Sequence, residues 1–166
     1  WNVVGIDLSW PMLSAAANRA REHRLDDRIH VVLAPMERIP ARDRSFDLVI
    51  AHGIWNLARS AGQFRRALEE GARVAKPGAG LFVFTFSRNT FPPHIAPVAG
   101  EPFVSTQFSG KRRCFLTEAQ LHAELGRVGF VRDPCVRFRE YNLSKPGTLS
   151  TGTVPVIYEA GFRREA

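Results

Sequence analysis

The sequence has few cysteines and lacks any long apolar run. Cys114 and Cys135 are the only two cysteines among 166 residues, and they form no C-x-x-C pair. Neither a disulfide framework nor a metal site of the zinc type is therefore indicated, and a reducing, cytoplasmic setting fits best. No stretch of about 18 apolar residues is present that could span a bilayer. The chain starts at Trp1 without a signal-peptide layout, and we interpret this start as a cut.

Acidic residues are in the minority. The chain has 23 Lys and Arg against 16 Asp and Glu, which gives a formal net charge of +7. Such an excess can mark a protein that binds a nucleic acid, and the nucleic acid could be either a partner or an RNA substrate for methylation. However, the basic residues are scattered, and only residues 111–113 form a tight cluster, without interleaved aromatic residues. We interpret the charge as a solvated basic surface and expect neither a nucleic-acid nor a membrane partner; no feature indicates an oligomeric state.

Apolar periodicity in the first half predicts strands that alternate with helices. Short apolar segments typical of buried strands occupy residues 2–6, 29–33, 46–51 and 81–87. Ser9 can cap a helix with Pro11 in its first turn, and a second helix is expected over residues 62–75, ended by Lys-Pro-Gly. This alternation predicts an α/β fold with a mostly parallel sheet.

The second half departs from this rhythm. Residues 89–114 are rich in Pro, Gly and Phe and show neither period, so we predict a lid-like insertion within a single partial domain over residues 1–166. Thr117 and Gln120 then form a capping box for a helix. The two final strands, residues 131–141 and 154–162, are joined by a connection too short for a crossover helix. We therefore expect an antiparallel hairpin.

Four segments follow one another in a telling order and spacing: VVGIDLSWPML, the MERIP turn, SFDLVIAHG and ALEEGARVAKPGAGLFVF. Together they resemble the class I S-adenosylmethionine-dependent methyltransferases of the small-molecule methyltransferase-domain type, over most of residues 3–84. The resemblance implies a Rossmann-like sheet with helices on both faces and a C-terminal antiparallel hairpin. It also implies S-adenosylmethionine as cofactor and methyl transfer to a small-molecule acceptor.

The resemblance also implies a first strand and a Gly-x-Gly loop before the segment that begins at Val3, and this sequence has neither there. Gly78 and Gly80 lie at a helix end before a strand, which is the reverse context. We therefore expect an N-terminally truncated fragment whose sheet lacks its first, central strand. Two inner strand edges would then be exposed, with weak stability and little or no turnover.

Candidate cofactor residues follow from where ligands bind in open α/β sheets, outside the carboxyl ends of the strands. Asp7, followed by Leu8, ends the first strand. The resemblance implies that the Asp7 carboxylate accepts hydrogen bonds from both ribose hydroxyls; alternatively, it only supports the start of the next helix. After the second strand, the family's Gly-Asp is replaced by Ala34-Pro35, so a side-chain contact to adenine is lost.

Met36 and Glu37 follow this replacement. Met36 can form an apolar wall for adenine with its backbone N–H near a ring nitrogen, and Glu37 can replace the missing acceptor. The alternative is that both are ordinary turn residues.

Ala51 and His52 end the third strand. The resemblance implies that backbone and side chains at this place lie close to the methionine part of the cofactor and to the acceptor. His52 is our candidate catalytic residue, because a neutral imidazole can accept a proton from the acceptor; the alternative is a structural histidine. Trp55 and Asn56 are candidate substrate contacts, although Trp55 also suits a core position.

Residues 89–114 follow the fourth strand, and Phe91 and His94 are the candidate substrate contacts on this segment. Two rival functions remain open. An acid after a Rossmann-like strand also suits the ribose of NAD in an oxidoreductase, and Pro35 with the absent loop suits a degenerate, non-catalytic cofactor-binding domain. The KPGAGLFVF segment and the terminal hairpin favour the methyltransferase.

Overall fold

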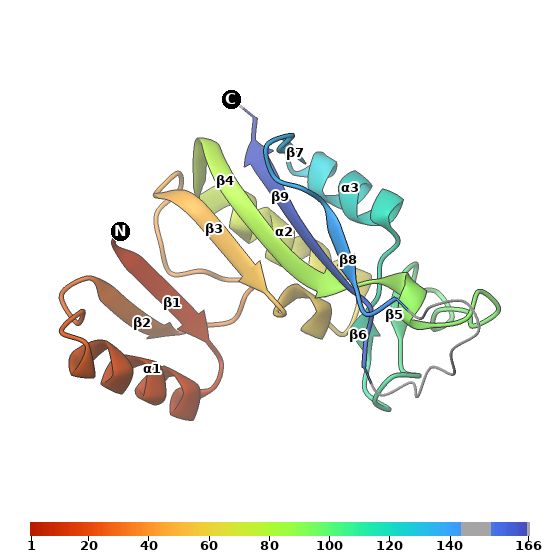
Figure 1. The fold of residues 1–166 in the computed structure, drawn as a ribbon, viewed down its shortest axis with the longest axis horizontal. Coiled ribbons are helices and arrows are strands. Elements are labelled where there is room, and N and C mark those ends of the chain that lie inside the picture. The colour runs from red at the N-terminus through yellow and green to blue at the C-terminus, as the bar shows by residue number, and fades with distance from the viewer. Residues whose placement is uncertain (144–153, 166) are drawn as a thin grey trace.

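The computed structural model describes residues 1–143 and 154–165. At its N-terminal end, strand β1 (Val3–Asp7) pairs in parallel with β2 (Ile29–Leu33), and helix α1 (Trp10–Glu22) packs against both strands (Figure 1). Ser9 caps α1 by accepting a hydrogen bond from the Met12 N–H at 3.5 Å. The predicted strand–helix–strand unit is thus confirmed, with strand boundaries within one residue of the expected ones.

The larger sheet has the strand order β3–β4–β9–β7. Its members are β3 (Phe46–His52), β4 (Ala75–Phe86), β7 (Phe130–Arg132), β8 (Arg139–Tyr141) and β9 (Ile157–Arg164). Strands β3 and β4 are parallel, whereas β9 runs antiparallel to β4, β7 and β8. The α/β fold class with a C-terminal antiparallel hairpin is therefore confirmed; the connection predicted between the last two strands lies outside the described residues.

Two predicted element boundaries were wrong. The single strand expected over residues 131–141 is two short strands, because Asp133 accepts a hydrogen bond from the Cys135 N–H at 2.9 Å in a local turn and Pro134 has no N–H to donate. Strand β4 begins at Ala75, immediately after helix α2 (Ala61–Val74), rather than at residue 81. Its Lys-Pro-Gly sequence lies in a bulge opposite Phe46–Leu48, where the register with β3 shifts.

Helices α2 and α3 (Glu118–Arg127) cover one face of the larger sheet (Figure 1). The core lies between them and alternate residues of β4, such as the fully buried Leu81 and Val83. Leu48 and Ile50 point to the opposite face and are 38% and 61% exposed, and no helix of the described chain covers them. Apolar surface therefore remains uncovered on β3.

Residues 89–114 are not a structureless loop. They adjoin a 3-10 turn, η2 (Arg88–Thr90), and contain the paired short strands β5 (Val104–Ser105) and β6 (Arg113–Cys114). Phe103 is buried and packs edge-on against Phe64 of α2, with ring centroids 5.2 Å apart. The segment is thus anchored in the core.

No described strand lies between β1 and β3, and these two strands do not pair with one another. Residues from both strands instead line a shared cavity. The expected pair of open inner strand edges is therefore present.

Candidate functional site

The cavity between β1 and β3 has a volume of about 390 Å³, within the range of about 300–1,000 Å³ for small-molecule sites. Its walls along the strands are apolar and include Val4 and Leu48. At the carboxyl ends of the strands its lining consists of Asp7, Met36, His52 and Ile54. The structure thus brings three sequence-predicted site residues to one end of one cavity.

Asp7 ends β1 and is half-buried. Its Oδ1 atom accepts a hydrogen bond from the Ser9 N–H at 2.7 Å, so the carboxylate does support the start of α1. Oδ2 has no hydrogen-bond partner within the parts of the chain that the structure describes. One oxygen fixes the side chain and the other is available to a ligand hydroxyl.

Met36 and Glu37 lie in the turn after β2 and face different surroundings. Met36 lines the cavity and packs against the hydrophobic core. Glu37 does not line it, because its Oε1 atom accepts a hydrogen bond from Gln63 Nε2 of α2 at 2.8 Å. Within this turn, Met36 therefore has the position expected of a cofactor contact, and Glu37 has a structural partner.

His52 is exposed at the end of β3, and its ring stacks on Phe84 of β4 with centroids 4.3 Å apart and planes within 5°. This stacking fixes the imidazole plane at the edge of the cavity. Ala51 points the other way and is buried in the core. The strand alternation therefore gives His52, and not Ala51, a side chain at the cavity.

Trp55 and Asn56 lie in the 3-10 turn η1 (Trp55–Leu57) and are buried. The Trp55 ring contacts Phe64 edge-on at 6.4 Å and lies close to Gly71 of α2, so it is a core residue. The Asn56 side-chain oxygen is buried and has no hydrogen-bond partner among the described residues. Neither residue lines the cavity that contains Asp7.

The remaining candidates lie apart from this cavity. Phe91 packs edge-on against Phe115, with ring centroids 4.6 Å apart, and His94 is exposed. Leu8 is 71% exposed and does not line the cavity. The cavity-lining residues Ile39 and Ile54 were missed by sequence reasoning, since an isolated isoleucine in an irregular segment gives no periodic signal.

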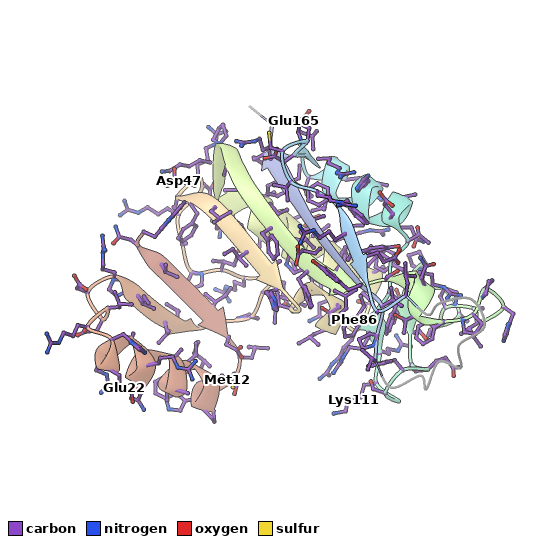
Figure 2. The ribbon with its side chains drawn as sticks, in the orientation of Figure 1. Met12, Glu22, Asp47, Phe86, Lys111 and Glu165 are labelled. Carbon is purple, nitrogen blue, oxygen red and sulfur yellow. The ribbon has the colours of Figure 1, made fainter. Side chains whose placement is uncertain are left out.

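The described residues contain no cluster of three or more His, Cys, Asp or Glu side chains that could bind a metal ion. Among the described helices, none is both long enough and apolar enough to cross a membrane. Figure 2 labels Asp47 near the start of β3 and Phe86 at the end of β4, so the run from one label to the other gives the direction of these two parallel strands.

Comparison with known sequences identifies a family and relatives that match part of this chain. The family described as "Methyltransferase domain" matches residues 1–78. The ubiquinone/menaquinone biosynthesis C-methyltransferase UbiE of Hahella chejuensis is 38% identical over 91 residues, which is 54% of this chain and 35% of that protein. The demethylmenaquinone methyltransferase of Lactiplantibacillus plantarum is 37% identical over 97 residues, covering 58% of this chain and 39% of that protein. This chain therefore spans well under half the length of these relatives.

Solved structures share the fold over nearly the whole chain. An S-adenosylmethionine-dependent methyltransferase from Methanosarcina mazei superposes with a TM-score of 0.72 and 20% identity, covering 99% of this chain and 82% of that chain. The [4+2]-cyclase SpnF gives a TM-score of 0.74 with 19% identity, covering 99% and 67%. Likenesses at this identity show the architecture alone. The match to the family, by contrast, covers residues 1–78 and so includes Asp7, Met36 and His52.

Proposed function

Because residues 1–78 match the family described as "Methyltransferase domain", we propose that this chain is part of a class I S-adenosylmethionine-dependent methyltransferase. We propose that the carboxyl end of its cavity takes part in binding S-adenosylmethionine and that the whole protein methylates a small-molecule acceptor. The observation that carries the proposal is the grouping of Asp7, Met36 and His52 at the carboxyl end of one cavity. This is the edge at which open α/β sheets bind their ligands.

The residues present fit the nucleoside half of the cofactor. The Asp7 carboxylate has an oxygen available for a ribose hydroxyl, and charged acceptors form the stronger hydrogen bonds. Met36 and Ile54 supply an apolar wall for a flat ring system. The Gly78–Gly80 segment lies near the start of β4 and does not line the cavity. We propose that N–H groups for the methionine carboxylate come from further residues.

The open edges of β1 and β3 support the same view. Val4 and Ile50, on these two strands, line the cavity and are 41% and 61% exposed. A parallel strand inserted here would pair with both edges and cover these side chains. We propose that an additional strand completes the sheet in the active protein, and that the chain alone binds the cofactor weakly.

The chemistry follows from the cofactor and from His52. S-adenosylmethionine supplies an electrophilic methyl group on a sulfonium. Transfer by in-line displacement needs alignment and exclusion of water more than strong catalysis. At the cavity edge, His52 is held by its stacking on Phe84, and we propose that its imidazole accepts the proton that the acceptor loses.

The acceptor class is also a proposal. Two relatives carry names that refer to ubiquinone, menaquinone or demethylmenaquinone. We propose a reduced quinone ring as the first acceptor to test. A new carbon–carbon bond forms to the ring as the carbon–sulfur bond breaks, the electron pair of that bond stays on sulfur, and the ring carbon loses its proton.

Binding can be tested by NMR, because Met36 is one of only two methionines. In protein with 13C-labelled methionine methyl groups, S-adenosylhomocysteine should shift the Met36 signal. Asp7→Asn should weaken binding by about tenfold or more, since a hydrogen bond to a charged group contributes about 1.5–3 kcal/mol. Asp26→Asn, at an exposed acid remote from the cavity, is the matched control.

Three outcomes separate the functions. A Met36 shift together with labelled methyl transfer to a demethylated quinol by the full-length protein supports the methyltransferase. A shift without any transfer supports a non-catalytic cofactor-binding domain. A shift with NAD but not with S-adenosylhomocysteine would point to an oxidoreductase and refute the proposal.

A further inference from the structure

The turn that places Met36 in the cavity has little regular structure of its own. Residues 34–45 form neither helix nor strand. Inside the turn, the Arg38 N–H donates to the Pro35 carbonyl at 3.1 Å and the Ala41 N–H donates to the Ile39 carbonyl at 2.8 Å. Backbone hydrogen bonds to β1 and to the end of α2 tie the two ends of the turn. Side chains from elsewhere bond to the residues in between, around Met36 and Ile39.

Those side chains come from one stripe of α2. Gln63, Glu70 and Arg73 are spaced by seven and then three residues, which places them on the same helix face. All three bond to the turn. None was singled out by sequence motifs, because each reads as an ordinary polar residue on the outside of a helix.

Gln63 bonds to the start of the turn. Its Nε2 donates to Glu37 Oε1 at 2.8 Å, while its Oε1 accepts from the Arg59 N–H at 2.9 Å. Both ends of the amide are thus engaged. Glu37, the neighbour of Met36, is held against α2 as a result.

Glu70 and Arg73 hold the middle of the turn. The Ile39 N–H donates to Glu70 Oε2 at 2.7 Å, and Arg73 Nη2 donates to the Ile39 carbonyl at 2.9 Å. Arg73 Nη1 also donates to the Ala41 carbonyl at 2.8 Å and to Asp43 Oδ1 at 2.7 Å. The peptide groups on both sides of the Ile39 side chain are therefore fixed, and this side chain lines the cavity.

Glu70 and Arg73 also hold each other. Arg73 Nε donates to Glu70 Oε1 at 2.8 Å, and their side chains are only 30% and 19% exposed for Arg73 and Glu70 respectively. The hydrogen bond from Arg73 lowers the pKa of the Glu70 carboxyl below its ordinary value. At neutral pH the pair is therefore ionised and pre-organised before any ligand binds.

We propose that Gln63, Glu70 and Arg73 are positioning residues that set the Met36–Ile39 wall of the cavity and thereby its affinity for the adenosine part of the cofactor. Pro35, next to Met36, has no polar side chain, so the wall acts through shape and through fixed backbone. The inference rests on the proposed function, because it assumes that this wall meets adenine.

The first test needs no ligand. In the free chain labelled with 13C-methyl methionine, Glu70→Ala should shift or broaden the Met36 signal. The Met12 signal is an internal reference, since Met12 lies at the start of α1 and is 63% exposed (Figure 2). Glu70→Gln retains an acceptor for the Ile39 N–H and should restore most of the Met36 signal. The matched control is Glu69→Ala, at the exposed neighbouring acid, which should change neither signal.

The second test uses adenosine as the probe. Glu70→Ala should weaken adenosine binding by about tenfold, equivalent to about 1.4 kcal/mol, and Glu69→Ala should leave it unchanged. If Glu70→Ala does not fold, Gln63→Ala provides the same comparison with loss of a single side-chain hydrogen bond to the turn.

The outcomes distinguish this inference from the proposed function. A lower melting temperature with an unmoved Met36 signal would mean that the three residues only stabilise the fold, and would overturn the inference. If the Met36 signal moves in the variants but adenosine does not perturb the unsubstituted chain, the three residues do position the turn, but the cofactor site is refuted. The expected result is a moved Met36 signal together with weaker adenosine binding in Glu70→Ala, and neither change in Glu69→Ala.

Discussion

One ion pair between α2 and α3 can be tested quantitatively. Arg65 Nε and Nη2 donate to the two carboxylate oxygens of Glu124 at 2.9 and 2.6 Å. The Glu124 side chain is 10% exposed and that of Arg65 is 39% exposed. The pair thus joins a nearly buried carboxylate to a guanidinium that water reaches on one side.

The expected costs differ between the two partners. Breaking a buried pair costs about 3–5 kcal/mol, and the exposure of Arg65 reduces this, so Arg65→Ala should lower the free energy of unfolding by about 2–3 kcal/mol. Glu124→Ala should cost less, about 1–2 kcal/mol, because the freed guanidinium can turn into water. The coupling energy from the double variant should be about 1–2 kcal/mol.

Urea unfolding at neutral pH, followed by helical circular dichroism, measures these values. With a slope of about 2 kcal/mol per molar urea, Arg65→Ala should lower the midpoint by about 1 M. Arg66→Ala, at the exposed neighbouring arginine, should stay within about 0.5 kcal/mol of the unsubstituted chain. A loss below about 0.5 kcal/mol in Arg65→Ala, or a coupling energy near zero, would refute the reasoning.

Three further predictions concern acid stability, thiol reactivity and packing. The hydrogen bond from Arg73 lowers the pKa of Glu70. The stabilising effect of the ionised Glu70 should therefore be complete above the ordinary Glu pKa of about 4.3 and should disappear as the pH falls through the lowered value. Acid unfolding should show this loss of stability, and Glu70→Gln should remove that part of the pH dependence. Burial raises the pKa of Cys114 to about 12, whereas Cys135 is exposed. A thiol reagent at mildly alkaline pH should therefore modify one thiol per folded chain and two after unfolding. Two fast-reacting thiols in the folded chain would contradict the burial of Cys114. A Cβ on Gly161 would lie 2.6 Å from Val136. Gly161→Ala should therefore lower the free energy of unfolding in urea by about 1–3 kcal/mol, and adding Val136→Gly should restore part of it. An unchanged urea midpoint would show that the loop containing Val136 moves freely.

Much of the fold could be predicted from sequence because its signals are local. The cap at Ser9, the capping box at Thr117 and the apolar runs of β1 and β3 each involve residues within a few positions of one another. Such patterns determine where elements begin and end. Local patterns fail where pairing with another strand determines the boundary. The bulge opposite β3, where the register shifts, allows β4 to start at Ala75.

The candidate site shows the same division. Asp7 and His52 could be identified because the last residue of a buried strand has a predictable place at the edge of a parallel sheet. Trp55 and Asn56 come soon after the end of β3 too, yet the 3-10 turn η1 directs them into the core. Proximity in sequence to a strand end is therefore insufficient once the chain turns.

The sequence by itself indicated the α/β alternation and the strand ends that carry Asp7 and His52, because these depend on spacing along the chain, and its four segments carried the resemblance to methyltransferases. Only the tertiary structure decided which candidates share a cavity and which side chains hold its wall. The bonds from Gln63, Glu70 and Arg73 to the turn span 26, 31 and 34 residues, and contacts at such separations arise from the packing of α2 against the sheet. Local patterns carry no information about that packing.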